Sequence, residues 1–289
     1  MIVDGRAVAA VAVLTMIWGS SFFLTTLALE GFHPMSIAFS RLALAAVVLV
    51  PLALISGAGL PRGAEWRTAF VLGAVGLALP QTLLAYAQRE LPSGTVSIFI
   101  AAVPLFTLVF AWLVLGDFIS KRRWTGFAIG FVGLLLLAGP TAFAGISAGP
   151  VSVVMAIFAA VFYAVSAIAI RGMKGMHPFR ATAGAMIMGS AVSAVFGISQ
   201  MPASLPPSGA IIGLVALGLF PTGLAQILRY YTVRRSGPVF SSIVGYLIPI
   251  WAGFLGVAIL DEAFLWRDLA AYGLILTGLL VARERRKPS

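Results

Sequence analysis

Glutamine side chains inside long apolar segments are the first residues of this chain that could do chemistry. Gln81 and Gln226 lie in two such segments, where an amide can donate and accept hydrogen bonds without competition from bulk water. When Pro80 is aligned with Pro221, the two glutamines fall on equivalent faces of two expected helices. A polar face that recurs in this way predicts the wall of a cavity for a small molecule, with hydrogen bonding between helices as the alternative.

Aromatic rings paired with hydroxyls at helical spacing offer a second kind of contact. Trp18 shares a helical face with Ser21, as Tyr246 does with Ser242. A ring can stack on a substrate or contact a cation while the hydroxyl forms a hydrogen bond. Tryptophan also gathers at membrane interfaces, but Trp18 lies 12 residues from Arg6, about 18 Å along a helix and so near mid-bilayer. The predicted substrate-binding residues are Trp18, Ser21, Gln81, Ser97, Tyr163, Gln226, Ser242 and Tyr246.

Two prolines and one arginine interrupt the apolar segments. Pro104 and Pro249 each remove an intrahelical hydrogen bond, which predicts a hinge or gate at each position, with a static kink as the alternative. Arg41 is the one cation deep within an apolar run. A buried charge in a membrane indicates function. The side chain could instead reach the interface or bond to helix-end carbonyls, and a structural role is favoured.

Other kinds of chemistry are excluded by what the sequence lacks. There is no cysteine, and the two histidines are too few for a zinc site without carboxylate ligands. The Asp and Glu residues lie near the ends of apolar segments, so neither a catalytic base nor a mid-membrane proton relay has residues to form it. We therefore expect no enzyme activity, no metal and no cofactor. Downhill or exchange transport is at least as well supported as proton coupling.

The elements that must position these residues are membrane-spanning helices. Of 289 residues, 61% are hydrophobic and 10% are charged, and the mean hydropathy of +1.05 excludes a soluble globular domain. The apolar runs exceed the strands of a membrane β-barrel, which have about 10 residues, and suit helices of about 20. Ten runs are expected to span the membrane, at about residues 7–28, 34–56, 67–87, 93–115, 124–139, 150–170, 179–199, 209–228, 238–260 and 268–282.

Charge predicts which loops share a side of the membrane. With ten spans, 16 of the 19 basic residues fall on the side of the two termini, and only Arg89 and Arg267 fall on the other. Basic residues favour cytoplasmic loops, so both termini are expected in the cytoplasm. The net charge of +10 is thereby explained by membrane orientation, and no nucleic-acid partner is expected.

The sequence also repeats itself at an offset of about half its length. Gly-Phe-His-Pro at 31–34 recurs as Gly-Met-His-Pro at 175–178, a shift of 144. A shift of 145 pairs Ser97 with Ser242, Pro104 with Pro249, Asp117 with Glu262 and Gly133 with Gly278. Because each half holds five helices, an odd number, the halves are expected to lie inverted in the membrane. The predicted repeats are residues 1–145 and 146–289.

Several motifs, in this order and spacing, resemble the drug/metabolite transporter superfamily, and within it the ten-helix exporters of the EamA type. The resemblance covers essentially the whole chain and rests on residues 18–22 (WGSSF), Pro34 with Arg41, residues 101–104 (AAVP), residues 115–117 (LGD) and residues 126–137. Within the superfamily, the chain is most similar to YddG-type exporters of aromatic and other amino acids. This resemblance implies an inner-membrane carrier with a central cavity, and export rather than import.

Together these features predict an all-α integral membrane protein with ten transmembrane helices in two inverted five-helix repeats. Its expected function is secondary transport: export of aromatic and other neutral amino acids, or related small metabolites, across a bacterial inner membrane by alternating access. The expected partners are the substrate and membrane lipid, and a monomer suffices. A multidrug or lipophilic-cation exporter on the same scaffold is the first alternative. A membrane-embedded enzyme is a remote one.

Overall fold

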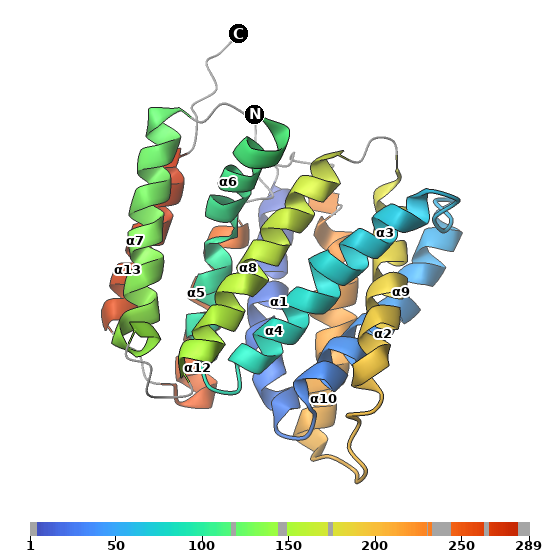
Figure 1. The fold of residues 1–289 in the computed structure, drawn as a ribbon. Helices are drawn as coiled ribbons and strands as arrows, with labels where there is room; N and C mark the ends of the chain where they lie inside the picture. Colours follow the sequence, from blue (N-terminus) through green and yellow to red (C-terminus); the bar gives the residue numbers. More distant parts are fainter. Residues whose placement is uncertain are drawn as a thin grey trace.

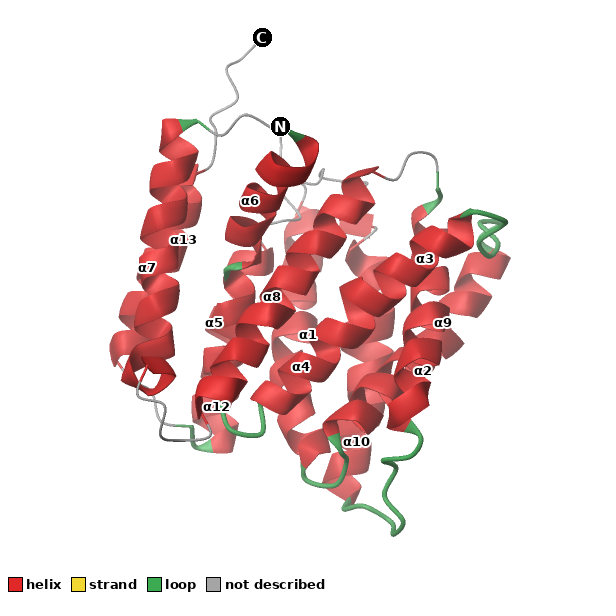
Figure 2. Cartoon of the chain, in the orientation of Figure 1, coloured by secondary structure: helices red, strands yellow, loops and turns green. Residues whose placement is uncertain are grey.

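The protein is a bundle of helices. The computed structural model describes residues 5–116, 120–143, 149–172, 176–229, 231–232, 244–262 and 266–282. In these residues the helices stand side by side (Figure 1), and Figure 2 shows helices and loops as the only elements among them. Seven of the described helices are long and apolar enough to cross a membrane. The predicted all-helical membrane fold is confirmed.

Each of the ten predicted spans contains described helix, and three spans are interrupted. The uninterrupted helices are α1 (Gly5–Leu29), α2 (Pro34–Ile55), α7 (Lys121–Phe143), α8 (Gly149–Gly172), α9 (Pro178–Gly197), α12 (Val244–Leu260) and α13 (Trp266–Ala282). The third span consists of α3 (Glu65–Gly73), the π-helix η1 (Ala74–Ala78) and α4 (Leu79–Ala87). The fourth consists of α5 (Ser93–Ala101) and α6 (Val103–Leu115), and the eighth begins with α10 (Ser208–Leu217) and the π-helix η2 (Gly218–Leu224).

The two π-helical segments occupy matching places in the two halves. They begin at Ala74 and Gly218, which are 144 residues apart, the offset of the repeated sequence motif. Within η2, the Thr222 hydroxyl donates to the carbonyl oxygen of Leu217 at 2.8 Å and so pairs a backbone acceptor inside the π-helical turn. Single π-helical turns within α-helices occur frequently at functional sites. These turns therefore direct attention to the middle of the third and eighth spans.

Packing between helices follows the same repeat. Helix α1 packs on α10 and α12, and α8, its counterpart in the second half, packs on α4 and α6. Gly218 of η2 lies against Leu44 of α2, and Gly73 of α3 lies against the backbone of α9 at Ala185. Glycine at both crossings lets the helix backbones approach closely. The contacts therefore repeat between the halves, whereas the boundary at residues 145 and 146 stays a prediction.

The two predicted hinge prolines lie in different local structures. Pro104 is at the start of α6, directly after the helix breaks at Ala102. The break separates two packing partners, because α5 packs mainly on α12 whereas α6 packs mainly on α8. Pro249 is buried inside α12, which continues without a break from Val244 to Leu260. The hinge role of both prolines stays a prediction, and Pro104 alone lies at a described break.

One end of the bundle is basic. Helices α3, α7 and α9 begin there, at the top of Figure 1, with Arg67, Lys121, Arg122 and Arg180 in or near their first turns. Arg122 Nε donates to the carbonyl oxygen of Val281 at 2.8 Å, so the end of α13 lies at the same end. We call this the basic end. The end where α1 and α4 finish and α5 begins is the opposite end.

Histidine caps explain the repeated His-Pro motif. Nδ1 of His33 accepts a hydrogen bond from the Met35 backbone at 3.4 Å at the start of α2, and Nδ1 of His177 accepts one from the Phe179 backbone at 3.3 Å at the start of α9. A proline suits the next position because the first turn of a helix leaves its N–H groups unpaired. Burial, and then the charge of Arg89, lower the pKa of His33, which keeps its ring neutral and able to accept.

We expect His33→Ala to lower the melting temperature of the purified protein by about 2–4 °C at pH 8, because losing a helix N-cap costs about 1 kcal/mol. The neutral ring stabilises the fold above the unfolded-state pKa of about 6.5. That contribution is lost as the pH falls from there through the lowered pKa of the folded protein, so the difference should narrow in acid. His33→Asn, which restores a capping acceptor, is the control. Equal melting temperatures at pH 8 would contradict the capping role.

Candidate functional site

A hydrogen-bonded polar cluster surrounds η2 in the middle of the bundle. Trp18 lies halfway along α1, and its indole Nε1 donates to the carbonyl oxygen of Pro221 at 3.0 Å. The hydroxyl of the next residue, Thr222, accepts a hydrogen bond from Nε of Arg41 at 3.2 Å. Helices α1 and α2 from the first half and η2 from the second half therefore meet at this point. We call these four residues the central cluster.

Arg41 keeps most of its donors unused. It lies seven residues after Pro34, about 10 Å along α2, and is half-buried. Its bond to Thr222 uses Nε, and among the described residues no Asp or Glu pairs with it. The four N–H groups of its two terminal nitrogens therefore form a free fork, which matches the two oxygens of a carboxylate. The sequence favoured a structural role for Arg41, which the bond to Thr222 fits, and that role stays a prediction.

Two of the predicted binding residues lie at the level of the central cluster. Tyr163, half-buried in α8, packs against the buried group that contains Phe22 of α1, one turn beyond Trp18. Gln81 lies one turn from Ala78, which packs in one buried group with Leu42 of α2. The side-chain oxygen of Gln81 is buried and has no hydrogen-bond partner in the described part of the chain. Such an acceptor is costly until a ligand or water donates to it.

The other predicted binding residues are engaged locally or lie outside the described part. Ser97 is fully buried and donates to the carbonyl oxygen of Gly94 at 2.6 Å. Ser21 donates to the carbonyl oxygen of Trp18 at 2.6 Å, and Gln226 is half-buried about one turn beyond Thr222. Ser242 lies outside the described residues, as does the side chain of Tyr246. Their roles in substrate binding stay predictions.

Sequence reasoning overlooked a second tryptophan. Nε1 of Trp251 in α12 donates to the hydroxyl of Ser20 at 3.0 Å. A Cβ added to Gly19 would stand 2.7 Å from Cδ1 of the Trp251 ring. Only glycine therefore fits at position 19 without displacing the ring. The glycine in the 18–22 motif was the available signal, because a glycine inside a helix often marks a close approach.

A cavity of about 350 Å³ lies at the opposite end, between α4 and α8. Its walls are Tyr86, Arg89, Glu90, Val151, Ser152 and Met155. Glu90 is already engaged, because the Ser152 hydroxyl donates to its carboxylate at 2.6 Å. The cavity lies at the ends of both helices and is separate from the central cluster.

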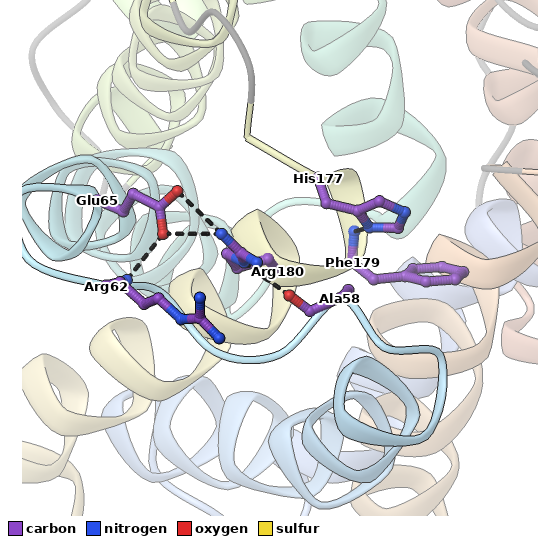
Figure 3. Close-up of polar contacts among 6 residues, drawn as sticks. All are labelled: Ala58, Arg62, Glu65, His177, Phe179 and Arg180. Carbon is purple, nitrogen blue, oxygen red and sulfur yellow. Dashed lines mark hydrogen bonds and ion pairs between the residues drawn. The ribbon is translucent and has the colours of Figure 1, made fainter.

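A small polar network connects helices and a loop at the basic end (Figure 3). Nη1 of Arg180 forms an ion pair with Glu65 at 3.2 Å, and its Nε donates to the carbonyl oxygen of Ala58 at 2.7 Å. The other Glu65 oxygen accepts from the Arg62 backbone at 2.8 Å. This network joins the loop after α2 to the starts of α3 and α9. Because the ion pair is partly exposed, it contributes modestly to stability.

Comparison with known families decides the class of this protein. A family model described as the EamA-like transporter family matches residues 5–139 and again residues 150–283. The chain belongs to the EamA-like transporter family. The two matches coincide with the two halves of the repeat, and the family consists of transporters, so this protein is a membrane transporter and not an enzyme.

Curated relatives agree with this assignment, and a solved structure shares the fold. The chain is 27% identical over 278 residues to the uncharacterized inner membrane transporter YedA of Escherichia coli, covering 94% of this chain and 89% of the relative. It is also 27% identical to a probable terminal-alkyne amino-acid exporter of Streptantibioticus cattleyicolor, over 94% of this chain and 89% of that protein. A crystal structure shares the fold, with a TM-score of 0.66, 20% identity and 96% of each chain covered.

Proposed function

We propose that this EamA-like transporter exports aromatic and other neutral amino acids, or closely related zwitterionic metabolites, across the inner membrane by alternating access. Two relatives support this proposal, since YedA is named an inner membrane transporter and the Streptantibioticus protein a probable amino-acid exporter. We also propose that, within the superfamily, this chain is most similar to the YddG-type exporters of aromatic amino acids.

The main support for the proposal is that the two terminal nitrogens of Arg41 have no hydrogen-bond partner among the described residues. An arginine in mid-membrane is costly unless its charge is paired, and in the described residues it has one neutral partner, Thr222. A substrate carboxylate supplies the missing negative charge and two acceptors in the planar geometry that guanidinium prefers. One arginine suits one carboxylate, so a substrate with several negative charges is disfavoured.

The rest of an amino acid finds matching groups at the same level. The unpartnered oxygen of Gln81 is an acceptor for the substrate ammonium. The rings of Trp18 and Tyr163 are half-buried and offer apolar area, and their faces, together with the aliphatic surroundings, suit a neutral or aromatic side chain. Because Arg41 repels positive charge, the same cluster disfavours a lipophilic cation that lacks a carboxylate.

Orientation and transport cycle form the second part of the proposal. We place the basic end in the cytoplasm because basic loops favour that side. Inverted halves at residues 1–145 and 146–289 give a transporter two equivalent ways to open around one site. The break before Pro104 is the proposed hinge, since α5 and α6 contact different helices and can move separately.

Transport assays with defined substrates test the proposed function. We expect saturable uptake of labelled tryptophan and phenylalanine into proteoliposomes, unchanged by an imposed pH gradient, and no uptake of tryptamine, which lacks the carboxylate. Trp18→Ala and Gln226→Ala should weaken uptake, because both side chains are proposed to line the site. Transport of a quaternary ammonium without the amino acids would replace this proposal with the cation-exporter alternative.

A further inference from the structure

Glu262 joins the two halves of the chain at the opposite end of the bundle. It follows α12, and its two carboxylate oxygens accept hydrogen bonds from the backbone N–H groups of Ser93 at 2.6 Å and Gly94 at 3.2 Å. These are the first N–H groups of α5, which have no partner within their own helix. A carboxylate there gains two charge-assisted bonds and the favourable end of the helix dipole.

The backbone is shaped to bring Glu262 to this position. Asp261 adopts a positive φ of 52°, and the Glu262 backbone N–H donates to the carbonyl oxygen of Gly256 at 3.1 Å, which turns the chain back over the end of α12. A Cβ on Gly256 would overlap the Glu262 carboxylate. A Cβ on Gly94 would stand 3.2 Å from the Cα of Gly253, so α5 and α12 lie very close.

Other contacts close the same end. Nε2 of Gln88, at the end of α4, donates to the carbonyl oxygen of Phe22 at 2.8 Å and to the hydroxyl of Thr26 at 3.3 Å. These bonds tie α4 to the last turns of α1. Helix α5 packs along α12 as well. The opposite end is therefore held by contacts within the first half, between α4 and α1, and by contacts between the halves, where α5 packs on α12.

The counterparts of Glu262, Ser93 and Gly94 under the 145-residue shift are Asp117 and residues 238 and 239, which lie outside the described residues. Arg229 is the counterpart of Gln88 when Pro80 is aligned with Pro221, and its side chain makes no hydrogen bond to α8 among the described residues. Helix α6, which leads from the break at Ala102 to the basic end, packs on α8 rather than along α12. The Glu262 contact therefore joins α12 to α5 at the opposite end, whereas the Arg180–Glu65 ion pair joins α9 to α3 at the basic end.

We infer that Glu262 is the residue that holds the opposite end of the transporter shut, and that its release from Ser93 and Gly94 opens that end. This inference rests on the proposed alternating access and is independent of the identity of the substrate. The carboxylate acts as a latch: it bridges α12 and α5, and it must leave the start of α5 before those helices can separate at the opposite end.

Cysteine accessibility tests the latch directly, because the natural chain contains no cysteine. Ser97, fully buried one turn inside α5, is replaced by cysteine as the reporter. A membrane-impermeant charged thiol reagent is then applied from each side, to spheroplasts and to inverted vesicles. We expect Glu262→Ala and Gly256→Ala to raise the labelling rate at least tenfold from the side of the opposite end, and to leave labelling from the basic end unchanged.

Gly253→Ala is the matched control, because a Cβ on Gly253 of the same helix meets nothing within 4 Å. It should label at the rate of the unaltered reporter protein. A latch variant that melts normally and labels no faster than this control overturns the inference, as does equal acceleration from both sides, which indicates general loosening. Faster labelling from the expected side in a protein that moves no amino acid supports the latch and rejects only the proposed substrate.

Discussion

Arg41→Gln is expected to lower the rate of tryptophan uptake at subsaturating concentration about 100-fold, while the protein stays folded. The substitution removes the charge and the fork that we assign to the substrate carboxylate, and each hydrogen bond to a charged group contributes about 1.5–3 kcal/mol. A loss near 2.7 kcal/mol corresponds to a factor of about 100. The measurement is the initial rate of uptake into proteoliposomes, with the melting temperature as the check on folding.

Two further variants separate binding from local structure. Arg41→Lys keeps the charge and loses the planar fork, so its rate should lie between those of the wild type and Arg41→Gln. Thr222→Val removes the partner of Nε and the bond to the Leu217 carbonyl but leaves the two terminal nitrogens of Arg41 in place, so it should affect uptake far less. Wild-type uptake by folded Arg41→Gln would remove Arg41 from the site and with it the main support for the proposed function.

Patterns repeated along the chain predicted much of the fold. Composition indicated a membrane protein and apolar length indicated ten spans, because crossing a bilayer imposes both requirements on any sequence. The His-Pro motif predicted the repeat, and its cause is visible in the caps formed by His33 and His177. The pairing of Gly133 with Gly278 also has a physical cause, since both glycines lie where α7 and α13 cross.

The site was harder to predict because side-chain partners depend on packing between distant helices. The sequence proposed Trp18, Gln81 and Tyr163 as binding residues, but it could not show that Arg41 bonds to Thr222, which lies 181 residues away and is its one partner among the described residues. The substrate-binding roles of Ser21 and Ser97 stay predictions, and their local bonds were not visible in the sequence. A serine inside a helix can donate to a nearby backbone carbonyl, as Ser97 does, and its oxygen then remains as an acceptor.

Gly278→Leu is expected to cause the largest loss of stability of the variants considered. A Cβ at this position would meet only backbone of α7, lying 2.5 Å from the Gly130 nitrogen and 2.8 Å from its Cα, and also overlapping the carbonyl oxygen of Gly126. No side chain can move aside, so the helices must separate. Overpacking of this kind costs about 3 kcal/mol or more, which lowers the melting temperature by about 10 °C.

Gly273→Leu on the same helix separates this clash from the intrinsic effect of replacing glycine. A Cβ there meets nothing within 4 Å, and leucine favours a helix by up to about 1 kcal/mol over glycine, so this control should melt at or above the wild-type temperature. Equal melting of the two leucine variants would contradict the close crossing of α7 and α13.

Uptake by Gly278→Leu should fall only in proportion to the folded protein recovered, because neither helix reaches the central cluster. Arg41→Gln should show the converse, a folded protein without transport, and the two results together distinguish the helix pair that supports the bundle from the residue that binds the substrate.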